Sequence, residues 1–439
     1  MNYKIKLNVV LKTIFFITFF SGFLGSAFLS IRISEDLSLF PFRIMMLLLV
    51  SVLFLSLFKN CNLGNIQRIR IYIIFLLCWF FYAVLTGLWV KSYPEYFKTI
   101  AFLIINIGFV LISLLINLNI NDFKKLYNIW IMALVISIGV GLWNQITGNY
   151  LIEYQTLDDI KGYTIFPVPQ SFYYNQNDYA SFIALSIPFV FSMFVNQASL
   201  KMKIFSILLI ILSLFQIITT FSRTNVIAIL FMFCFYSLVI SKNKFKMCVV
   251  IVMIVATSIY AIHQIVSVDN LDKITRQLSV STGEEVDESS AIRANLIRNG
   301  FEYLIGSRGF GIGAGNTEYY MQTYKIYDTG GVINMHNWLM QIFVEYGIII
   351  FTLYLLFWFF IVRNVYRIFN YSQKIKDVVN TKISLALLLS LILFILVSNS
   401  SSNYINVIPQ WLLFSFSLSY IKYHNDHGVF CNAYSDYPV

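Results

Sequence analysis

Arg223, Arg293 and His336 are the side chains in this sequence whose types best suit group-transfer chemistry. An arginine stays charged at any physiological pH, and its guanidinium donates paired hydrogen bonds to anions. A histidine with an ordinary pKa near 6.5 accepts a proton around neutral pH. Together these three residues could hold an anionic group and move a proton.

Spacing alone leaves two interpretations open for each residue. Arg223 lies in a short hairpin between apolar runs, so it either snorkels to lipid headgroups or points into a cavity. Arg293 has no carboxylate four residues later, whereas Arg298 is followed at that spacing by Glu302 and is expected to be structural. His336 precedes an apolar run, where a histidine is either an interfacial side chain or a base.

A long polar segment, residues 267–337, contains two of these residues. Acidic residues crowd its middle, and a predicted helix carrying Arg293 leads to Arg308 and a glycine-rich run over 309–316. The run follows a helix rather than a strand, so the dinucleotide-loop context is missing and close backbone packing is the better interpretation. Arg308 and Asn337 are further candidates for substrate binding.

Helical periodicity continued from His336 predicts the residues that share its face. Met340, Phe343 and Gly347 fall on that face, where Gly347 would admit another helix, and Glu345 falls on the opposite face. Glu345 would then be protonated or would contact another helix. Upstream, Asn177 is a predicted helix cap, and the free backbone amides at the N-terminus of that helix would suit a phosphate. The carboxylate of Asp178 beside it disfavours an anion.

The elements that must position these residues are membrane helices. The chain has 439 residues, of which 58% are hydrophobic and 12% charged, against about 25% charged in soluble proteins. Apolar runs of spanning length recur throughout and predict an all-α, polytopic membrane protein with about 12 transmembrane helices. The expected spans are residues 9–31, 42–58, 71–90, 99–117, 127–146, 178–196, 204–220, 225–241, 247–266, 338–361, 383–399 and 407–421.

Charge sets the expected orientation. Lys and Arg concentrate in alternate connections, which places both termini in the cytoplasm and the 267–337 segment outside. The expected organisation is therefore helices 1–9 over residues 1–266, an extracytoplasmic loop over 267–337, helices 10–12 over 338–421 and a cytoplasmic tail over 422–439. The formal charge of +10 then reflects topology and not a nucleic-acid partner. No CxxC motif or His/Cys cluster indicates a metal site, and no cysteine falls in an outward loop.

Several fragments, taken in order, resemble the bacterial O-antigen polymerase and O-antigen ligase family. They are Asn177-Asp178-Tyr179-Ala180 leading to Pro188, Ser222-Arg223, Arg293 ahead of the glycine run, and His336-Asn337 with Gly347 ten residues beyond. The resemblance covers about residues 170–350. Ile350 departs from the small or polar residue that many members have there.

The resemblance implies a membrane glycosyltransferase of the bacterial cytoplasmic membrane. Its substrate would be an oligosaccharide linked to polyprenyl (undecaprenyl) diphosphate, and its surroundings membrane lipids, with a flippase and a chain-length regulator as partner proteins. Arg223 and Arg293 would hold the diphosphate, and His336 would activate the acceptor hydroxyl. The reaction would invert the anomeric carbon and require no metal or cofactor.

Three functions fit this resemblance or the composition. A polymerase of surface polysaccharide repeat units is favoured because the chain is unusually aromatic, at 18%, and divergent, as the repeat-specific polymerases that it resembles tend to be. A ligase would transfer the finished glycan to a lipid-A core or another acceptor. A lipid-sugar flippase is the alternative from another class, but it would more often show internal repeats and mid-helix charges.

Reporter fusions test the orientation. A reporter joined at Lys244 or Asn370 should read as cytoplasmic and one joined at Glu285 as external, because basic connections stay inside. Alkaline phosphatase and green fluorescent protein activities of the fusions measure this. A cytoplasmic signal at Glu285 would invert the topology and separate the candidate residues from an external substrate.

Overall fold

The computed structural model describes residues 2–25, 28–32, 38–58, 66–151, 167–196, 199–241, 249, 252 and 288–427. Within these ranges the regular secondary structure is helical, apart from two short antiparallel strands in which Ile31 pairs with Leu39. Most of the expected ninth span (247–266), the acidic residues Glu284, Glu285 and Asp287, and Cys61, Cys248 and Cys431 lie outside the described residues.

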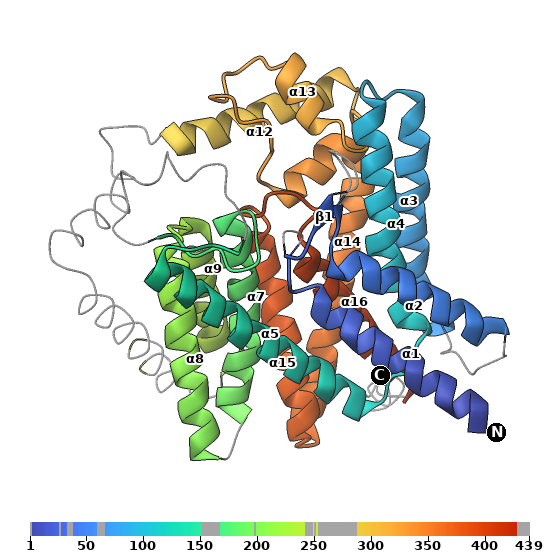
Figure 1. The fold of residues 1–439 in the computed structure, drawn as a ribbon, viewed down its shortest axis with the longest axis vertical. Coiled ribbons are helices and arrows are strands. Elements are labelled where there is room, and N and C mark those ends of the chain that lie inside the picture. The colour runs from blue at the N-terminus through green and yellow to red at the C-terminus, as the bar shows by residue number, and fades with distance from the viewer. Residues whose placement is uncertain are drawn as a thin grey trace, which may run out of the picture.

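The helices form a bundle with a smaller helical cap at one end, shown at the top of Figure 1. The elements are α1 (Asn2–Ser21), β1 (Ile31–Arg32), β2 (Ser38–Leu39), α2 (Pro41–Phe58), η1 (Gln67–Ile69), α3 (Arg70–Leu85), η2 (Thr86–Leu88), α4 (Tyr93–Leu115), α5 (Ile120–Thr147), α7 (Gln176–Asn196), α8 (Leu200–Thr219), α9 (Arg223–Phe235), η3 (Tyr236–Ile240), α12 (Glu288–Gly306), α13 (Thr317–Thr323), α14 (Trp338–Lys374), α15 (Val378–Val397) and α16 (Ile408–Asp426).

Nine helices in the described part of the chain are long and apolar enough to cross a membrane. The all-α, multi-pass prediction is therefore confirmed, but the number twelve is not. The expected first span, 9–31, is wrong at its end: α1 stops at Ser21, and the chain then turns through Gly25, whose φ is +67°. A Cβ at Gly25 would lie 2.1 Å from the Phe172 carbonyl oxygen, so this turn packs against the chain before α7.

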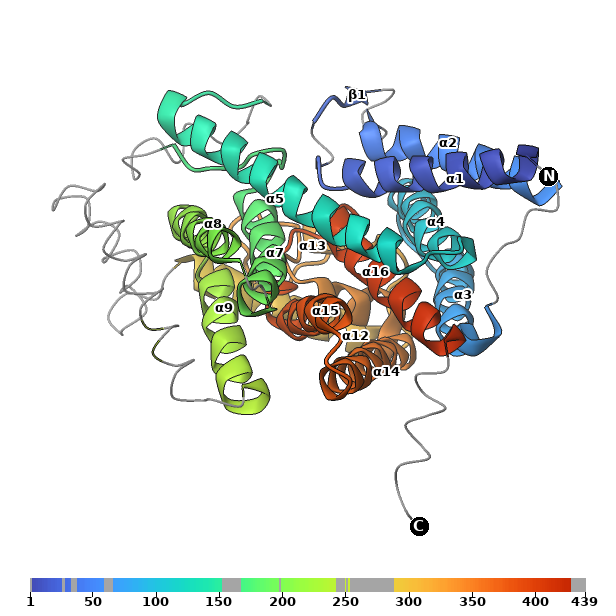
Figure 2. The ribbon, with the colours of Figure 1, turned by 90° about the horizontal axis from the view of Figure 1, so that it is seen from below.

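Three helices form the centre of the bundle. Figure 2 shows α7, α15 and α16 enclosed by the other helices. In α7, 89% of the residues in its most apolar 18-residue stretch are buried, and the helix has no basic residue. Small hydroxyl side chains link it to its neighbours: Trp130 donates to Ser186 (2.9 Å), and Ser390 of α15 donates to the Leu185 carbonyl (2.8 Å).

The helix α14 contains a sharp break at Gly347, where φ is +75° and ψ is −176°. Trp338 and Tyr354 would lie about 24 Å apart along a straight helix, yet the Trp338 indole N–H donates to the Tyr354 hydroxyl at 2.9 Å. The rings of Phe343 and Phe351 are 4.7 Å apart. The two parts of α14 therefore fold back on each other at Gly347. The expected straight span over 338–361 is wrong, because residues 348–374 form a helix of about 40 Å that is long enough to cross the bilayer alone.

The cap consists of α12, α13 and the first part of α14, residues 338–346 (Figure 1). A small apolar core joins them, with Leu296 of α12, Met321 of α13 and Val344 of α14 among its buried members. A Cβ at Gly300 would lie 3.0 Å from side-chain atoms of both Met340 and Val344, so α12 rests closely on this part of α14.

Replacing Gly347 with alanine should destabilise the protein strongly. A Cβ there would lie 2.2 Å from the Gly309 carbonyl oxygen, and the positive φ is strained for alanine. Crowding and strain of this kind cost about 1–3 kcal/mol each. Thermal unfolding in detergent should show a lower melting temperature for Gly347→Ala.

The matched control is Gly139→Ala in α5, where nothing lies within 4 Å of the added carbon. It should be neutral or slightly stabilising, because alanine is the better helix former. Equal melting temperatures for the two variants would show that the break at Gly347 tolerates a side chain.

Candidate active site

The glycine-rich run fills the break in α14 with its backbone. The amides of Ile312 and Gly313 donate to the carbonyls of Val344 and Glu345, each at 3.0 Å, and the Ile348 amide donates to the Gly309 carbonyl at 3.0 Å. The break frees these helix groups, and an unpaired buried backbone group is costly. The run therefore supplies the hydrogen bonds that α14 gives up at Gly347.

The other side of the run contacts the turn between α3 and α4. The Trp89 indole donates to the Gly311 carbonyl (3.0 Å), and the Ala314 amide donates to the Thr86 hydroxyl (3.1 Å). A Cβ at Gly311 would lie 2.5 Å from the Glu345 carbonyl oxygen, so glycine is needed for this approach. The expectation of close backbone packing is confirmed. The sequence predicts that another helix approaches Gly347. In the structure the glycine-rich run approaches it instead.

Glu345 connects the run to the rest of the site. Its side chain is fully buried, and its two carboxylate oxygens accept four hydrogen bonds: from the Gly315 amide (2.9 Å), the Thr317 hydroxyl (2.9 Å), the Gln341 amide (2.9 Å) and the Tyr404 hydroxyl (2.8 Å). Sequence reasoning left its role open between protonation and a contact with another helix. The structure shows the Glu345 side chain held by donors from the glycine run, α13, α14 itself and the α15–α16 connection.

The α15–α16 connection, residues 398–407, is the part of the site that sequence reasoning missed. The Ser398 carbonyl accepts from the Trp338 amide (2.9 Å), so the connection lies directly beside the residues that precede α14. Ser400 contacts the hydroxyl of Ser222 (3.1 Å), and Ser402 donates its amide and hydroxyl to Asp178 (2.7 and 2.6 Å). The signal was the run Ser398-Asn399-Ser400-Ser401-Ser402-Asn403 between two apolar stretches.

His336 lies in the short approach to α14 and not on the helix. Its φ is +47°, an uncommon value for a non-glycine residue, and its amide donates to the Asn334 side chain at 2.9 Å. Asn334 in turn donates to Glu318 at 3.0 Å. The helical face predicted from His336 is therefore wrong, because α14 begins only at Trp338.

The pKa of His336 is lowered to about 4, first by burial and then by the positive charge of Arg293. Both effects disfavour the imidazolium. The expectation of an ordinary pKa near 6.5 is corrected accordingly. The imidazole is neutral, and so able to accept a proton, throughout the range from about pH 5 upwards.

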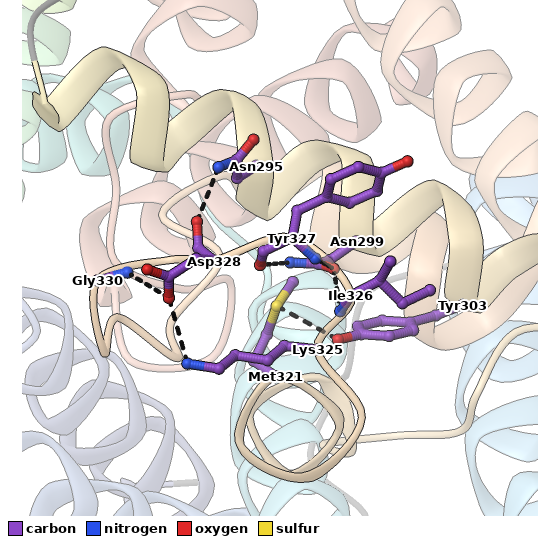
Figure 3. A network of polar contacts seen from close by, with 9 residues as sticks. All are labelled: Asn295, Asn299, Tyr303, Met321, Lys325, Ile326, Tyr327, Asp328 and Gly330. Carbon is purple, nitrogen blue, oxygen red and sulfur yellow. Dashed lines mark hydrogen bonds and ion pairs between the residues drawn. The ribbon is translucent and has the colours of Figure 1, made fainter.

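The position of Arg293 is set by hydrogen bonds that fix α12 to residues 326–328. Figure 3 shows these bonds: Asn299 accepts from the amides of Ile326 and Tyr327, both at 2.9 Å, and Asn295 donates to the Asp328 carbonyl at 2.8 Å. Arg293, half-buried one turn and a half before Asn299, is near enough to His336 to influence its proton affinity. The structure thus brings these two predicted residues together.

Arg298, expected to pair with Glu302, has other contacts. It donates to Asn295 at 3.5 Å, and its guanidinium lies 5.8 Å from the centre of the Tyr327 ring. Its role remains structural, but its partners lie on the preceding turn and on the 325–330 turn.

Arg223 is the first residue of α9, where Ser222 and Asn225 flank it. Both neighbours are buried, and both contact Ser400: the Asn225 amide donates to its hydroxyl at 3.2 Å. Arg223 itself is half-buried. Its segment therefore contacts the α15–α16 connection, which also contacts the start of α14.

Asn177 is not the cap of its helix. Asn175 performs that function, since its side-chain oxygen accepts from the Asn177 amide at 2.7 Å and its carbonyl accepts from Asp178 and Tyr179. The half-buried Asn177 lies next to Asp178, whose carboxylate is occupied by Ser402. Asn177 therefore lies at the edge of the site, next to the contact between Asp178 and Ser402.

Asn337 and Arg308, the two other predicted binding residues, lie in different surroundings. Asn337 caps α14, accepting from the Met340 amide at 2.9 Å, so its side-chain oxygen is engaged in the fold. Arg308 is exposed in the turn after α12, next to the Gly309 contact with Ile348. It belongs to the outer surface of the cap and does not join His336 and Arg293.

Two comparisons with known proteins bear on this site. Residues 207–355 match the family described as O-Antigen ligase. The chain is also 26% identical over 408 residues to the teichuronic acid biosynthesis protein TuaE of Bacillus subtilis (strain 168), covering 91% of this chain and 82% of that protein. The matched family region contains Arg223, Arg293, Arg308, His336 and Asn337, whereas Asn177 precedes it.

Removing the charge of Arg293 should raise the pKa of His336. In Arg293→Met the repulsion disappears but the burial remains, so the pKa should rise from about 4 without reaching the ordinary value. Selective imidazole labelling and NMR titration of the protein in nanodiscs measure it.

The control Arg298→Met removes a guanidinium from the same helix that does not influence His336, and it should leave the titration unchanged. Equal titration curves for wild type and Arg293→Met would show that Arg293 does not face the histidine.

Proposed function

Because residues 207–355 match the O-antigen ligase family, we propose that this chain polymerises surface polysaccharide at the outer face of the bacterial cytoplasmic membrane. The resemblance inferred from sequence is thereby confirmed at the level of the family, and polysaccharide biosynthesis by a membrane enzyme of polymerase or ligase type follows from it. The substrate, the residue roles and the topology are our proposal.

The proposed donor is a glycan on polyprenyl diphosphate. In the reaction, an acceptor sugar hydroxyl attacks the anomeric carbon of the donor, and the bond from that carbon to the diphosphate oxygen breaks. The hydroxyl proton passes to the imidazole of His336, and the diphosphate leaves with the electron pair. Arg223 and Arg293 neutralise the charge that develops on it. Direct displacement inverts the anomeric carbon.

The single observation that supports these roles best is the proximity of Arg293 to His336, which, together with burial, lowers the pKa of the imidazole. A base must be unprotonated to act, and a cation is needed where negative charge develops. Burial of His336, with the charge of the half-buried Arg293 nearby, keeps the imidazole neutral, so one arrangement serves both needs. The flanks of Arg223 connect to the same region through Ser400.

A ligase is the second candidate, favoured by the description of the matched family. The two activities share the donor chemistry and differ in the acceptor. Glycans extracted from a deletion strain distinguish them: single repeat units at the surface indicate a lost polymerase, and long chains left on the carrier lipid indicate a lost ligase.

Chain growth on a synthetic lipid-linked repeat, measured with purified protein in nanodiscs, tests the proposed roles. Arg223→Ala and Arg293→Ala should each slow growth by about 10²–10³-fold, the usual cost of one charge-stabilising donor. His336→Gln should cost about 10²–10⁴-fold, because it keeps hydrogen bonding but cannot accept the proton. Wild-type activity should persist at pH 5.5 and fall only as the pH approaches about 4.

Arg298→Ala is the control on α12 and should remain near the wild-type rate, because its contacts are to Asn295 and Tyr327. Full activity of His336→Gln would assign the residue to acceptor positioning. A wild-type rate that halves near pH 6.5 would contradict the lowered pKa.

A further inference from the structure

The cap carries an apolar surface that the proposed reaction does not use. Phe301 and Ile305 on the last turns of α12, with Phe310 in the following turn, are 47%, 70% and 57% exposed. We call these three residues the cap patch. Large exposed apolar side chains that cluster in this way mark a surface for a partner or a membrane.

The cap patch is fixed to two helices that cross the membrane. The Phe310 carbonyl accepts from the Tyr82 hydroxyl of α3 at 2.6 Å. The neighbouring Gly309 carbonyl accepts from the Ile348 amide of α14 at 3.0 Å. Residues 309 and 310 therefore lie between α3 and the crossing part of α14.

These contacts also set the depth of the patch. On α3 and the following turn η2, the exposed apolar residues continue beyond Tyr82 to Leu85 (49%) and Leu88 (79%). Leu88 lies six residues past Tyr82, or about 9 Å further along the helix axis. Because Tyr82 lies below the last exposed apolar residues of its own helix, the turn attached to it lies within the apolar zone.

On α14 the apolar surface is continuous with the patch. Ile348 and Ile349 are 52% and 62% exposed, and the Ile348 side chain is 3.0 Å from where a Cβ would lie on Gly309. A row of rings joins the same surfaces, since Phe301 is 6.0 Å from Phe343, which is 4.7 Å from Phe351.

Charged residues border the patch as they do on helices at a membrane surface. Arg298 and Arg308 are exposed beside it, with Glu302 between them. Arginines place their apolar stems along lipid and their charged ends among headgroups. Arg308, which the site does not use, has this position.

We propose that the cap patch is inserted into the outer leaflet of the membrane, with lipid acyl chains as its partner. Its direct continuity with the exposed apolar faces of α3 and α14 identifies lipid as the occupant. The cap is thus anchored in the bilayer at the end of α12, in addition to its attachment to α14. This proposal does not depend on the enzymatic activity.

Site-directed spin labelling in nanodiscs tests the insertion. In a background with the five native cysteines replaced, labels are placed through Ile305→Cys and Phe310→Cys. Ile349→Cys supplies the lipid-facing reference. Ile326→Cys supplies the aqueous reference, because Ile326 is 64% exposed on the 325–330 turn of the cap. Collision with oxygen reports lipid, and collision with a water-soluble nickel chelate reports solvent.

Labels at positions 305 and 310 should resemble the label at 349, with high oxygen and low nickel accessibility, while the label at 326 should show the reverse. Quenching of a bimane dye at the same positions by brominated lipids gives an independent readout. High nickel accessibility at 305 and 310 would overturn the proposal. Shielding from both reagents would also overturn it, because a second copy or another protein would then cover the patch.

Discussion

The contact on which the site depends is the insertion of a glycine-rich backbone into a broken membrane helix. At Gly347 the helix α14 folds back, and residues 309–316 supply hydrogen bonds to the freed backbone groups. The fully buried Glu345 completes the joint, because its side chain accepts four hydrogen bonds, from residues 315–317, from its own helix and from the α15–α16 connection. A buried carboxylate without such donors would be costly. The joint therefore holds the cap, the start of α14 and the α15–α16 connection in one arrangement.

This arrangement explains how residues far apart in sequence form one site. His336 is placed just before α14, in a strained turn held by Asn334, and Arg293 approaches it from α12. The α15–α16 connection links the beginning of α14 to the beginnings of α7 and α9 through hydrogen bonds. Rigid mounting by buried hydrogen bonds is what preorganised charge stabilisation requires.

The sequence was sufficient for the fold class and for the resemblance to the matched family, because long apolar runs and the order of short polar motifs are local patterns. It was sufficient for the packing role of the glycines but not for their partner, since a helix break at Gly347 depends on contacts about 35 residues away. The sequence did not point to the α15–α16 connection as part of the site, because the residues of this connection carry no charge. It gave His336 its ordinary pKa, because burial and the proximity of Arg293 exist only in the folded chain.

We propose that Arg223, Arg293 and His336 act on one lipid-linked glycan, and a cryo-EM structure with a bound polyprenyl diphosphate sugar would show this. Diphosphate oxygens should lie within hydrogen-bonding distance of both guanidinium groups, and the anomeric carbon should be directed toward the imidazole. A diphosphate bound elsewhere, with His336 contacting protein alone, would show that these residues do not act on the glycan.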